Sequence, residues 1–305
     1  MFDTKRCTAR PFLKWAGGKA QLISSISISL PGYIKTSKDL VYVEPFLGSG
    51  AILFWFLQAF PNTKKAIVND INPDLFKAYS IIKKEPANLI KELAKLQDKY
   101  YSLNNEEDRK NFFLAQRESF NTRNLNPLQN TTLLIFINRT CYNGLYRVNS
   151  KGLFNVPFGK YSNPRICDAE TIRWDSQLLQ KVTILNGDYT ETLSYVDSPK
   201  AFFYLDPPYK PISNSSSFNA YSIESFDDAE QERLKDFCTR IDALGHSWLL
   251  SNSDVKNFDS KNEYFDNLYK DFNINRVKAT RRINSNSSKR GEIFELLISN
   301  YNQGN

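Results

Sequence analysis

The order of short apolar runs between residues 40 and 70 constrains the fold of this chain more than any other feature. Leu40 to Val43 form an apolar run that is typical of a buried strand. A glycine-containing turn, Gly48-Ser49-Gly50, follows it, and then an apolar helical stretch from Ala51 to Phe60. A second strand, Ala66 to Val68, ends just before Asp70. This strand–turn–helix–strand order predicts a nucleotide-binding α/β sheet.

The middle of the chain has a different character. From residue 73 it is amphipathic and rich in Lys and Glu, then polar, and finally crowded with Gly, Asn and aromatic residues. Strand patterns return at 182–185 and 201–205, with further candidates at 247–250 and 295–299. We therefore predict one core domain built from residues 1–72 and 175–305, interrupted by an inserted domain at 73–174.

Composition narrows the classes of function. The chain has 305 residues and a formal net charge of +7, which is compatible with a polyanionic partner. A single histidine, His246, excludes His-based triads and multi-histidine metal sites, and the four cysteines form no CxxC pair. We expect no signal peptide, and the apolar stretch 52–60 is too short to span a bilayer. These features predict a cytoplasmic protein.

Asp206-Pro207-Pro208-Tyr209 is the sharpest chemical signal, because it directly follows the apolar strand 202–205. The two prolines fix φ and remove two backbone donors. The Asp206 carboxylate and the Pro207 carbonyl are then acceptors that face one spot, where an exocyclic amine could donate two N–H bonds. Accepting both would turn the amine lone pair out of conjugation, and Tyr209 could stack on the ring. The structural alternative is a plain Pro-Pro turn.

Three features near the N-terminus are compatible with a nucleotide ligand. The glycines of Phe46-Leu47-Gly48-Ser49-Gly50 would let the backbone approach a ligand, although such a segment alone is also an ordinary turn. Asp70 stands where an acid can bind ribose hydroxyls, or it caps a helix before Pro73, a task that Asn72 could also perform. Trp15 could stack on an adenine ring or be a buried tryptophan. The Gly18-Lys19 pair lacks the spacing of a P-loop.

Residues 141–161 have the pattern of a hairpin that binds nucleic acid. Asn143-Gly144 and Ser150-Lys151-Gly152 are turn signals. Arg147 lies between them and suits bidentate contact with guanine, while Tyr142 could wedge into a base stack. Each residue taken singly could be a solvated loop residue, but basic and aromatic side chains together on a hairpin favour nucleic acid.

The chain resembles the Dam-type family of DNA adenine methyltransferases. The matching segments follow the family's order: FLKWAGGK (12–19), VEPFLGSG (43–50), NDINPDL (69–75), NRTCYNGLYRVNSKGLFNVPFGKY (138–161), GDY (187–189), DPPY (206–209) and LSNSD (250–254). The resemblance implies an α/β fold with a Rossmann-like S-adenosylmethionine-dependent methyltransferase core. It also implies that the inserted domain, helical with a β-hairpin, recognises DNA.

The resemblance assigns roles to residues of this chain. The catalytic motif is Asp206, Pro207, Pro208 and Tyr209. The donor pocket is formed by the glycine turn together with aromatic and acidic side chains: Trp15, Phe46, Gly48, Gly50, Asp70, Asp188 and Tyr189. DNA is contacted by Lys14 and by hairpin residues: Tyr142, Leu145, Arg147, Asn155, Pro157 and Tyr161. Tyr189 stands where the family has phenylalanine and retains an aromatic face, whereas Cys141 departs from the pattern without an interpretation.

These features predict a site-specific enzyme that transfers a methyl group from S-adenosylmethionine to the 6-amino group of adenine in double-stranded DNA. The resemblance points to GATC as the target, with the adenine flipped into the pocket. We expect no metal, no membrane association and a monomer that works on DNA in the cytoplasm or nucleoid, either alone or beside a restriction endonuclease. Two alternatives stay open: methylation of the cytosine 4-amino group or of RNA, and a DNA-binding protein without activity.

Overall fold

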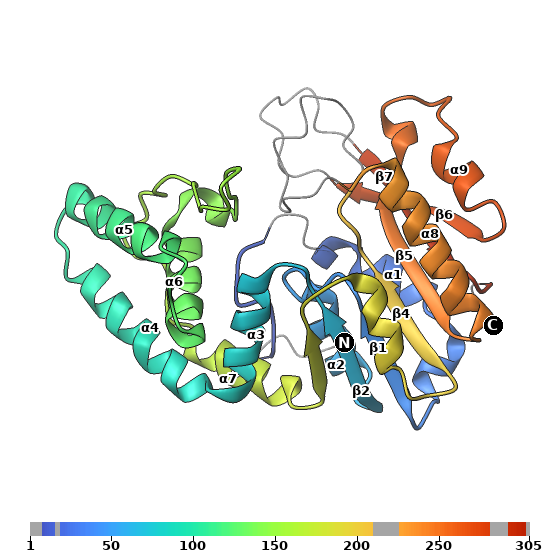
Figure 1. The fold of residues 1–305 in the computed structure, drawn as a ribbon, viewed down its shortest axis with the longest axis horizontal. Helices are drawn as coiled ribbons and strands as arrows, with labels where there is room; N and C mark the ends of the chain where they lie inside the picture. The colour runs from blue at the N-terminus through green and yellow to red at the C-terminus, as the bar shows by residue number, and fades with distance from the viewer. Residues whose placement is uncertain (1–7, 16–18, 210–225, 281–291, 303–305) are drawn as a thin grey trace.

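A single seven-stranded sheet organises the molecule (Figure 1). The structure is a computed structural model that describes residues 8–15, 19–209, 226–280 and 292–302. The strands lie in the order β3-β2-β1-β4-β5-β7-β6. The first five are parallel, whereas β7 runs antiparallel to both of its neighbours. The chain thus builds the sheet outward from β1 in one direction, then returns to β4 and builds in the other.

The strand bounds agree closely with those expected from the sequence, apart from one strand that was not anticipated. They are β1 Leu40–Glu44, β2 Thr63–Asn69, β3 Val182–Leu185, β4 Ala201–Leu205, β5 Ser247–Ser253, β6 Asn273–Thr280 and β7 Glu292–Ser299. The unexpected strand is β6 at the edge of the sheet, whose sequence NINRVKAT has only three apolar residues scattered among polar ones. The predicted α/β fold is therefore confirmed.

Both faces of the sheet are covered, because alternate side chains of each strand point to opposite sides. On β1, Leu40 and Tyr42 join one buried cluster, which also contains residues of α1 (Ile23–Ser29) and α2 (Ala51–Ala59). Val41 and Val43 join the other cluster, with residues of α8 (Asp228–Ala243) and α9 (Tyr264–Leu268). Strands that are buried on both faces read as continuous apolar runs, which explains why they were visible in the sequence.

Five helices lie between β2 and β3 and form the left-hand lobe of Figure 1. They are α3 Pro73–Lys84, α4 Pro86–Tyr101, α5 Glu106–Asn121, α6 Pro127–Thr140 and α7 Ala169–Leu179. Asn and Pro residues define the starts of two of them: Asn72 caps α3 and Asn126 forms a capping box on α6, each followed directly by proline. The apolar cluster of the sheet continues into this lobe through α3 and α6. The predicted end of the insert, residue 174, lies within α7. Among the described residues, no helix is long and apolar enough to cross a membrane.

Asp175 on α7 gives the fold a pH-dependent weakness. Its Oδ1 accepts the backbone N–H of Arg10 at 3.0 Å, while its buried Oδ2 has no partner among the described residues. Burial raises the pKa of Asp175 to about 8, so the folded chain retains a proton that the unfolded chain releases near pH 4. Because the folded state binds more protons between these values, its stability falls as pH rises from about 4 to about 8.

We therefore expect Asp175→Asn, which keeps the Oδ1 acceptor and removes the charge, to gain thermal stability relative to wild type as pH rises. The difference in melting temperature should widen from pH 5 to about pH 8 and then stay constant. Asp168→Asn is the control, because Arg10 and Arg165 pair with Asp168 and its pKa is lowered. That variant should be less stable by an amount that does not change over the same range. A constant difference for Asp175→Asn would contradict the prediction.

Candidate active site and nucleic-acid interface

The site lies at the carboxyl ends of the neighbouring strands β1 and β4. The strands that follow β1 in the chain lie on one side of this pair, and those that follow β4 lie on the other. Such a switch point leaves a crevice above the strand ends, where ligands bind in open α/β sheets. The turn after β1 contains Gly48 and Gly50, with φ of +51° and +69°. An added Cβ on Gly50 would lie 2.6 Å from the Tyr79 hydroxyl, so only glycine fits there without displacement. Glycine at position 50 therefore lets the turn pack closely against the buried Tyr79.

Asp70, at the end of β2, holds this turn in place. Its Oδ2 accepts the backbone N–H of Gly48 at 2.8 Å, and its Oδ1 accepts that of Asn72 at 2.9 Å. Burial raises the pKa of Asp70, and these two backbone N–H groups partly oppose that shift. The helix cap itself is Asn72, which accepts the N–H of Asp74. Each carboxylate oxygen of Asp70 has a second lone pair that remains available to a hydroxyl group.

Aromatic and charged side chains stand beside the turn. The Phe46 ring lies 4.9 Å from that of Tyr189, which begins the short 3-10 helix η4 (Tyr189–Tyr195) after β3. Arg233 of α8 lies 4.8 Å over the Tyr189 ring and donates to Asp188 Oδ2 at 2.6 Å. This pairing lowers the pKa of Asp188 and keeps it ionised. The structure thus brings Phe46, Asp188 and Tyr189 together, as predicted, and adds Arg233 to them.

Trp15 lies on the opposite side of the glycine turn. A Cβ built on Gly48 would be 3.7 Å from its indole nitrogen, and the partly exposed indole stacks at 5.0 Å on Tyr146. Trp15 is therefore packed but partly exposed, and its stacking on a ligand stays a prediction. Gly17 and Gly18, which follow it, lie outside the described residues.

The Asp206 carboxylate emerges directly from the end of β4. Its Oδ1 accepts the Ser251 hydroxyl at 3.0 Å and lies 3.2 Å from the Lys19 ammonium. Within the described chain, both contacts involve Oδ1, and 21% of the side chain is exposed. Burial raises the pKa of Asp206 while Lys19 lowers it. Oδ2 is therefore the oxygen that can accept a bond from a ligand.

Three residues of this cluster were missed by the sequence analysis: Lys19, Ser251 and Glu295. Lys19 Nζ lies 4.0 Å from the Tyr209 ring centroid and 3.1 Å from Glu295 Oε2, and the Tyr209 hydroxyl donates to the same Oε2 at 2.8 Å. Lys19 and Glu295 are both buried. A lone acid within the apolar run of β7 was a usable signal, because buried charges are rare unless paired.

The predicted hairpin is present between α6 and α7. Asn143 and Gly144 both adopt left-handed φ, and the tip closes where the Gly152 N–H donates to Asn149 O at 2.9 Å. Across the hairpin, Arg147 Nε donates to Asn155 Oδ1 at 2.7 Å. Most of the predicted DNA contacts on the hairpin are exposed, namely Tyr142, Arg147, Asn155 and Pro157, whereas Leu145 and Tyr161 are half-buried.

Cys141, which the sequence left without an interpretation, is a structural residue. It is buried, its thiol contacts Leu145 O at 3.3 Å, and it forms a β-bridge with Phe158 at the base of the hairpin. Burial raises the pKa of the thiol to about 12, so it stays neutral and unreactive at physiological pH.

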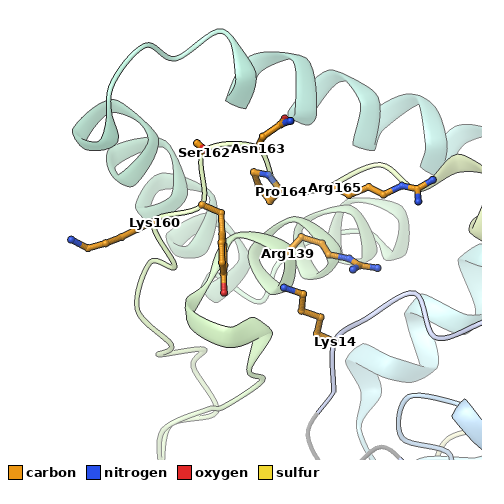
Figure 2. A pocket seen from close by; sticks show the side chains of 8 residues that line it. Lys14, Arg139, Lys160, Ser162, Asn163, Pro164 and Arg165 are labelled. Atoms are coloured by element: carbon orange, nitrogen blue, oxygen red, sulfur yellow. The ribbon is translucent and has the colours of Figure 1, made fainter. Parts of the chain in front are cut away.

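A basic hollow of about 470 Å³ lies where the N-terminal segment meets the hairpin (Figure 2). Four cationic side chains line it, namely Lys14, Arg139, Lys160 and Arg165. Lys14 lies 5.0 Å from the Tyr161 ring centroid, and its backbone N–H donates to Asn138 Oδ1 at 2.9 Å. The structure thus places Lys14 beside the hairpin, although the two are far apart in sequence. Two of these cations are ion-paired, Lys160 with Glu106 and Arg165 with Asp168, each at 2.9 Å. The hollow is still lined by more cationic than acidic side chains, which suits a polyanion.

Comparison with known proteins agrees with this geometry. Residues 15–283 match the family described as D12 class N6 adenine-specific DNA methyltransferase. A type II methyltransferase of Methanocaldococcus jannaschii, M.MjaIII, is 45% identical over 96% of this chain and 99% of its own length. M1.LlaDCHI of Lactococcus lactis subsp. cremoris, also a type II methyltransferase, is 35% identical over 99% of both chains. A DNA adenine methylase of Haemophilus influenzae is 32% identical over 94% of this chain and 92% of its own.

Proposed function

Because the chain belongs to the D12 class N6 adenine-specific DNA methyltransferases, and therefore methylates adenine in DNA, we propose that S-adenosylmethionine supplies the methyl group and that the crevice above β1 and β4 is where transfer occurs. We also propose that residues 1–72 and 175–305 form the catalytic domain and that residues 73–174 recognise the target. Asp206 stands at the carboxyl end of β4, and its contacts with described residues all involve Oδ1; this is the observation that carries the proposal.

The groups around the glycine turn fit the donor. The positive-φ backbone at Gly48 and Gly50 leaves room for a nucleoside to approach, and Asp70 can accept bonds from the ribose hydroxyls. Phe46 and Trp15 offer aromatic faces on either side, while Asp188 can accept a bond from the exocyclic amine of the donor's adenine. When bound, the sulfonium of the donor supplies an electrophilic methyl carbon and a neutral leaving group.

The residues after β4 act on the target amine. Asp206 Oδ2 and the Pro207 carbonyl accept its two N–H bonds, which frees the nitrogen lone pair to attack the methyl carbon as the carbon–sulfur bond breaks. The raised pKa of Asp206 suits a carboxylate toward which a proton of the methylated amine moves. Tyr209 stacks on the flipped base, and Glu295 orients this ring through its hydroxyl. Alignment of amine, methyl and sulfur supplies most of the catalysis.

DNA lies across the face formed by Lys14, the basic hollow and the hairpin. Arg139, Lys160 and Arg165 of the hollow hold the phosphate backbone, whereas Lys14 reaches a base from the N-terminal segment. On the hairpin, Leu145, Arg147 and Pro157 face the remaining base edges. A palindromic site presents the same sequence on both strands, so a monomer can methylate each strand in turn. Such an enzyme works wherever the cell's DNA lies, in the cytoplasm or nucleoid.

Radiolabelled methyl transfer to DNA of mixed sequence, followed by nucleoside analysis, tests the proposal. We expect N6-methyladenine as the labelled product, with label transferred from S-adenosylmethionine. Label in 4-methylcytosine, label that enters RNA alone, or no transfer at all would each contradict it. Sequencing of methylated positions in DNA treated with pure enzyme then identifies the target, for which we propose GATC. Methyladenine found mainly outside GATC would overturn that assignment.

Arg147→Ala should lose discrimination at a single base pair of the target. A bidentate guanidinium contact with guanine supplies about 1–3 kcal/mol of preference, and Asn155 already holds the Arg147 side chain in place. Methylation rates on duplexes with each single substitution in the target measure this effect. Lys160→Ala is the control, because loss of a phosphate contact weakens binding to all sequences alike and reduces the salt dependence. If Arg147→Ala lowers the methylation rate equally on all these duplexes, Arg147 contacts the DNA backbone instead.

A further inference from the structure

Tyr146 is a hairpin residue whose side chain contacts both Trp15 and the start of α3, on either side of the glycine turn's supports. Its ring stacks on Trp15 with 5.0 Å between centroids and 27° between planes. Its hydroxyl donates to Asp74 Oδ2 at 2.9 Å. Tyr146 is only 4% exposed, so it has no surface to offer to DNA. A buried residue between two binding regions is a candidate for positioning one relative to the other.

The contacts of Tyr146 close into a ring that includes the donor side. Asp74 donates its backbone N–H to Asn72, and Asn72 donates its own to Asp70. Asp70 accepts the Gly48 N–H, and Gly48 lies against Trp15, which returns to Tyr146. The links are hydrogen bonds and one ring stack, except between Gly48 and Trp15, where a Cβ added to Gly48 would lie 3.7 Å from the indole nitrogen. The donor-binding acid and the hairpin are therefore mechanically connected along two routes.

The same tyrosine fixes the hairpin. Tyr146 is buried, whereas its neighbours Leu145 and Arg147 are half-buried and exposed. Asp74 Oδ2 also accepts Arg123 Nη1 at 2.8 Å, and Arg123 in turn donates to Gly152 O at the hairpin tip. The position of Tyr146 thus determines where the neighbouring DNA-facing side chains lie. Through Asp74 and Arg123 it also determines where the hairpin tip lies.

We propose that Tyr146 is a positioning residue that couples donor binding to specific DNA binding. The inference rests on the proposed function, because it takes Trp15 as part of the donor pocket and the hairpin as the DNA-facing element. When the donor occupies the crevice, Trp15 and Asp70 are restrained, and through Tyr146 and Asp74 the hairpin is restrained in its DNA-binding arrangement. Restraining these residues costs conformational entropy, and the first ligand to bind bears that cost. The second ligand then meets residues that are already restrained, so each ligand raises the affinity of the protein for the other.

The dissociation constant of a duplex carrying the mapped target sequence, measured with and without saturating sinefungin, tests the coupling. Sinefungin is a donor analogue that cannot transfer a methyl group. For wild type we expect the analogue to tighten DNA binding at least about fivefold, the lower end of common coupling factors. Linkage requires the duplex to tighten sinefungin binding by the same factor. Tyr146→Leu should bring the factor close to one, and Tyr146→Phe, which keeps the ring and loses the Asp74 bond, should lower it at least about twofold.

Tyr301→Phe is the matched control, because it removes one tyrosine hydroxyl bond, to Ser29 O at 3.0 Å, elsewhere in the core. It should retain the full factor. Melting temperatures show whether each variant folds. If Tyr146→Leu does not fold, the coupling factor of Tyr146→Phe decides the test. A wild-type factor of one, or an unchanged factor in the folded Tyr146 variants, overturns the inference while leaving the proposed function intact. If wild type binds neither the analogue nor DNA, the proposed function fails and this inference fails with it.

Discussion

Asp206→Ala should abolish methyl transfer while leaving donor binding largely intact. The target amine loses its side-chain acceptor, and removal of one group that stabilises a transition state costs on the order of 10²–10³ in rate. The Lys19 ammonium would also lose its contact with Oδ1 and, among the described residues, would retain Glu295 as its acidic partner. Donor affinity should persist, because Asp70 and the glycine turn lie on other strands. Turnover is measured with labelled donor, and affinity is measured by calorimetry.

Ser251→Ala is the control for this experiment. It removes the hydroxyl that bonds Asp206 Oδ1 but leaves the carboxylate and its Lys19 contact in place. We expect a reduction in rate far smaller than that of Asp206→Ala. A methyl-transfer rate near that of wild type in Asp206→Ala would show that Asp206 takes no part in the reaction. Equal losses of rate in Asp206→Ala and Ser251→Ala would show that Asp206 contributes to packing only.

Asp70→Ala should weaken donor binding by about 1.5–3 kcal/mol, the range for hydrogen bonds to charged groups. The structure adds a second reason for the loss, because the Gly48 and Asn72 N–H groups both lose their acceptor. The glycine turn is then no longer held in the shape that a nucleoside would meet. Calorimetric titration with sinefungin measures the loss, and thermal unfolding measures the accompanying fall in stability.

Asn72→Ala separates these two effects. It removes the cap of α3, where the Asn72 side chain accepts the Asp74 N–H, and does not touch the Asp70 carboxylate. Loss of such a cap costs about 0.5–2 kcal/mol of stability. We expect this variant to melt earlier and to bind the donor nearly as wild type does. If Asp70→Ala behaves in the same way, Asp70 has a structural role only.

The sheet could be predicted because its central strands are apolar on both faces and end in chemically distinctive residues. The runs before Glu44, Asp70 and Asp206 were visible for this reason, and parallel strands with carboxyl ends at one edge bring such residues together. The edge strand β6 was missed because one side of it pairs with no other strand, and its mostly polar residues resemble a loop. The family resemblance supplied the hairpin contacts, which local patterning alone leaves ambiguous.

The rest of the site could not be predicted because it depends on contacts between distant segments. Lys19 was considered only as part of a P-loop and rejected, and nothing local shows that it lies between Asp206 and Glu295. Arg233 on α8 looks like an ordinary exposed helix cation until the fold places it over Tyr189. The stack of Trp15 on Tyr146 likewise joins the N-terminal segment to a hairpin more than a hundred residues later.

The pairing of Lys19 with Glu295, 276 residues apart in the chain, also bears on how the protein is made. During synthesis, β1 and β2 can pair early, but the other edge of β1 must wait for β4, which follows the whole insert. Contacts of such long range slow folding and leave a strand edge exposed meanwhile. The emerging chain can therefore assemble the cluster of Lys19, Asp206 and Glu295 only when β7 joins the sheet. We expect termination before β7 to yield an inactive product.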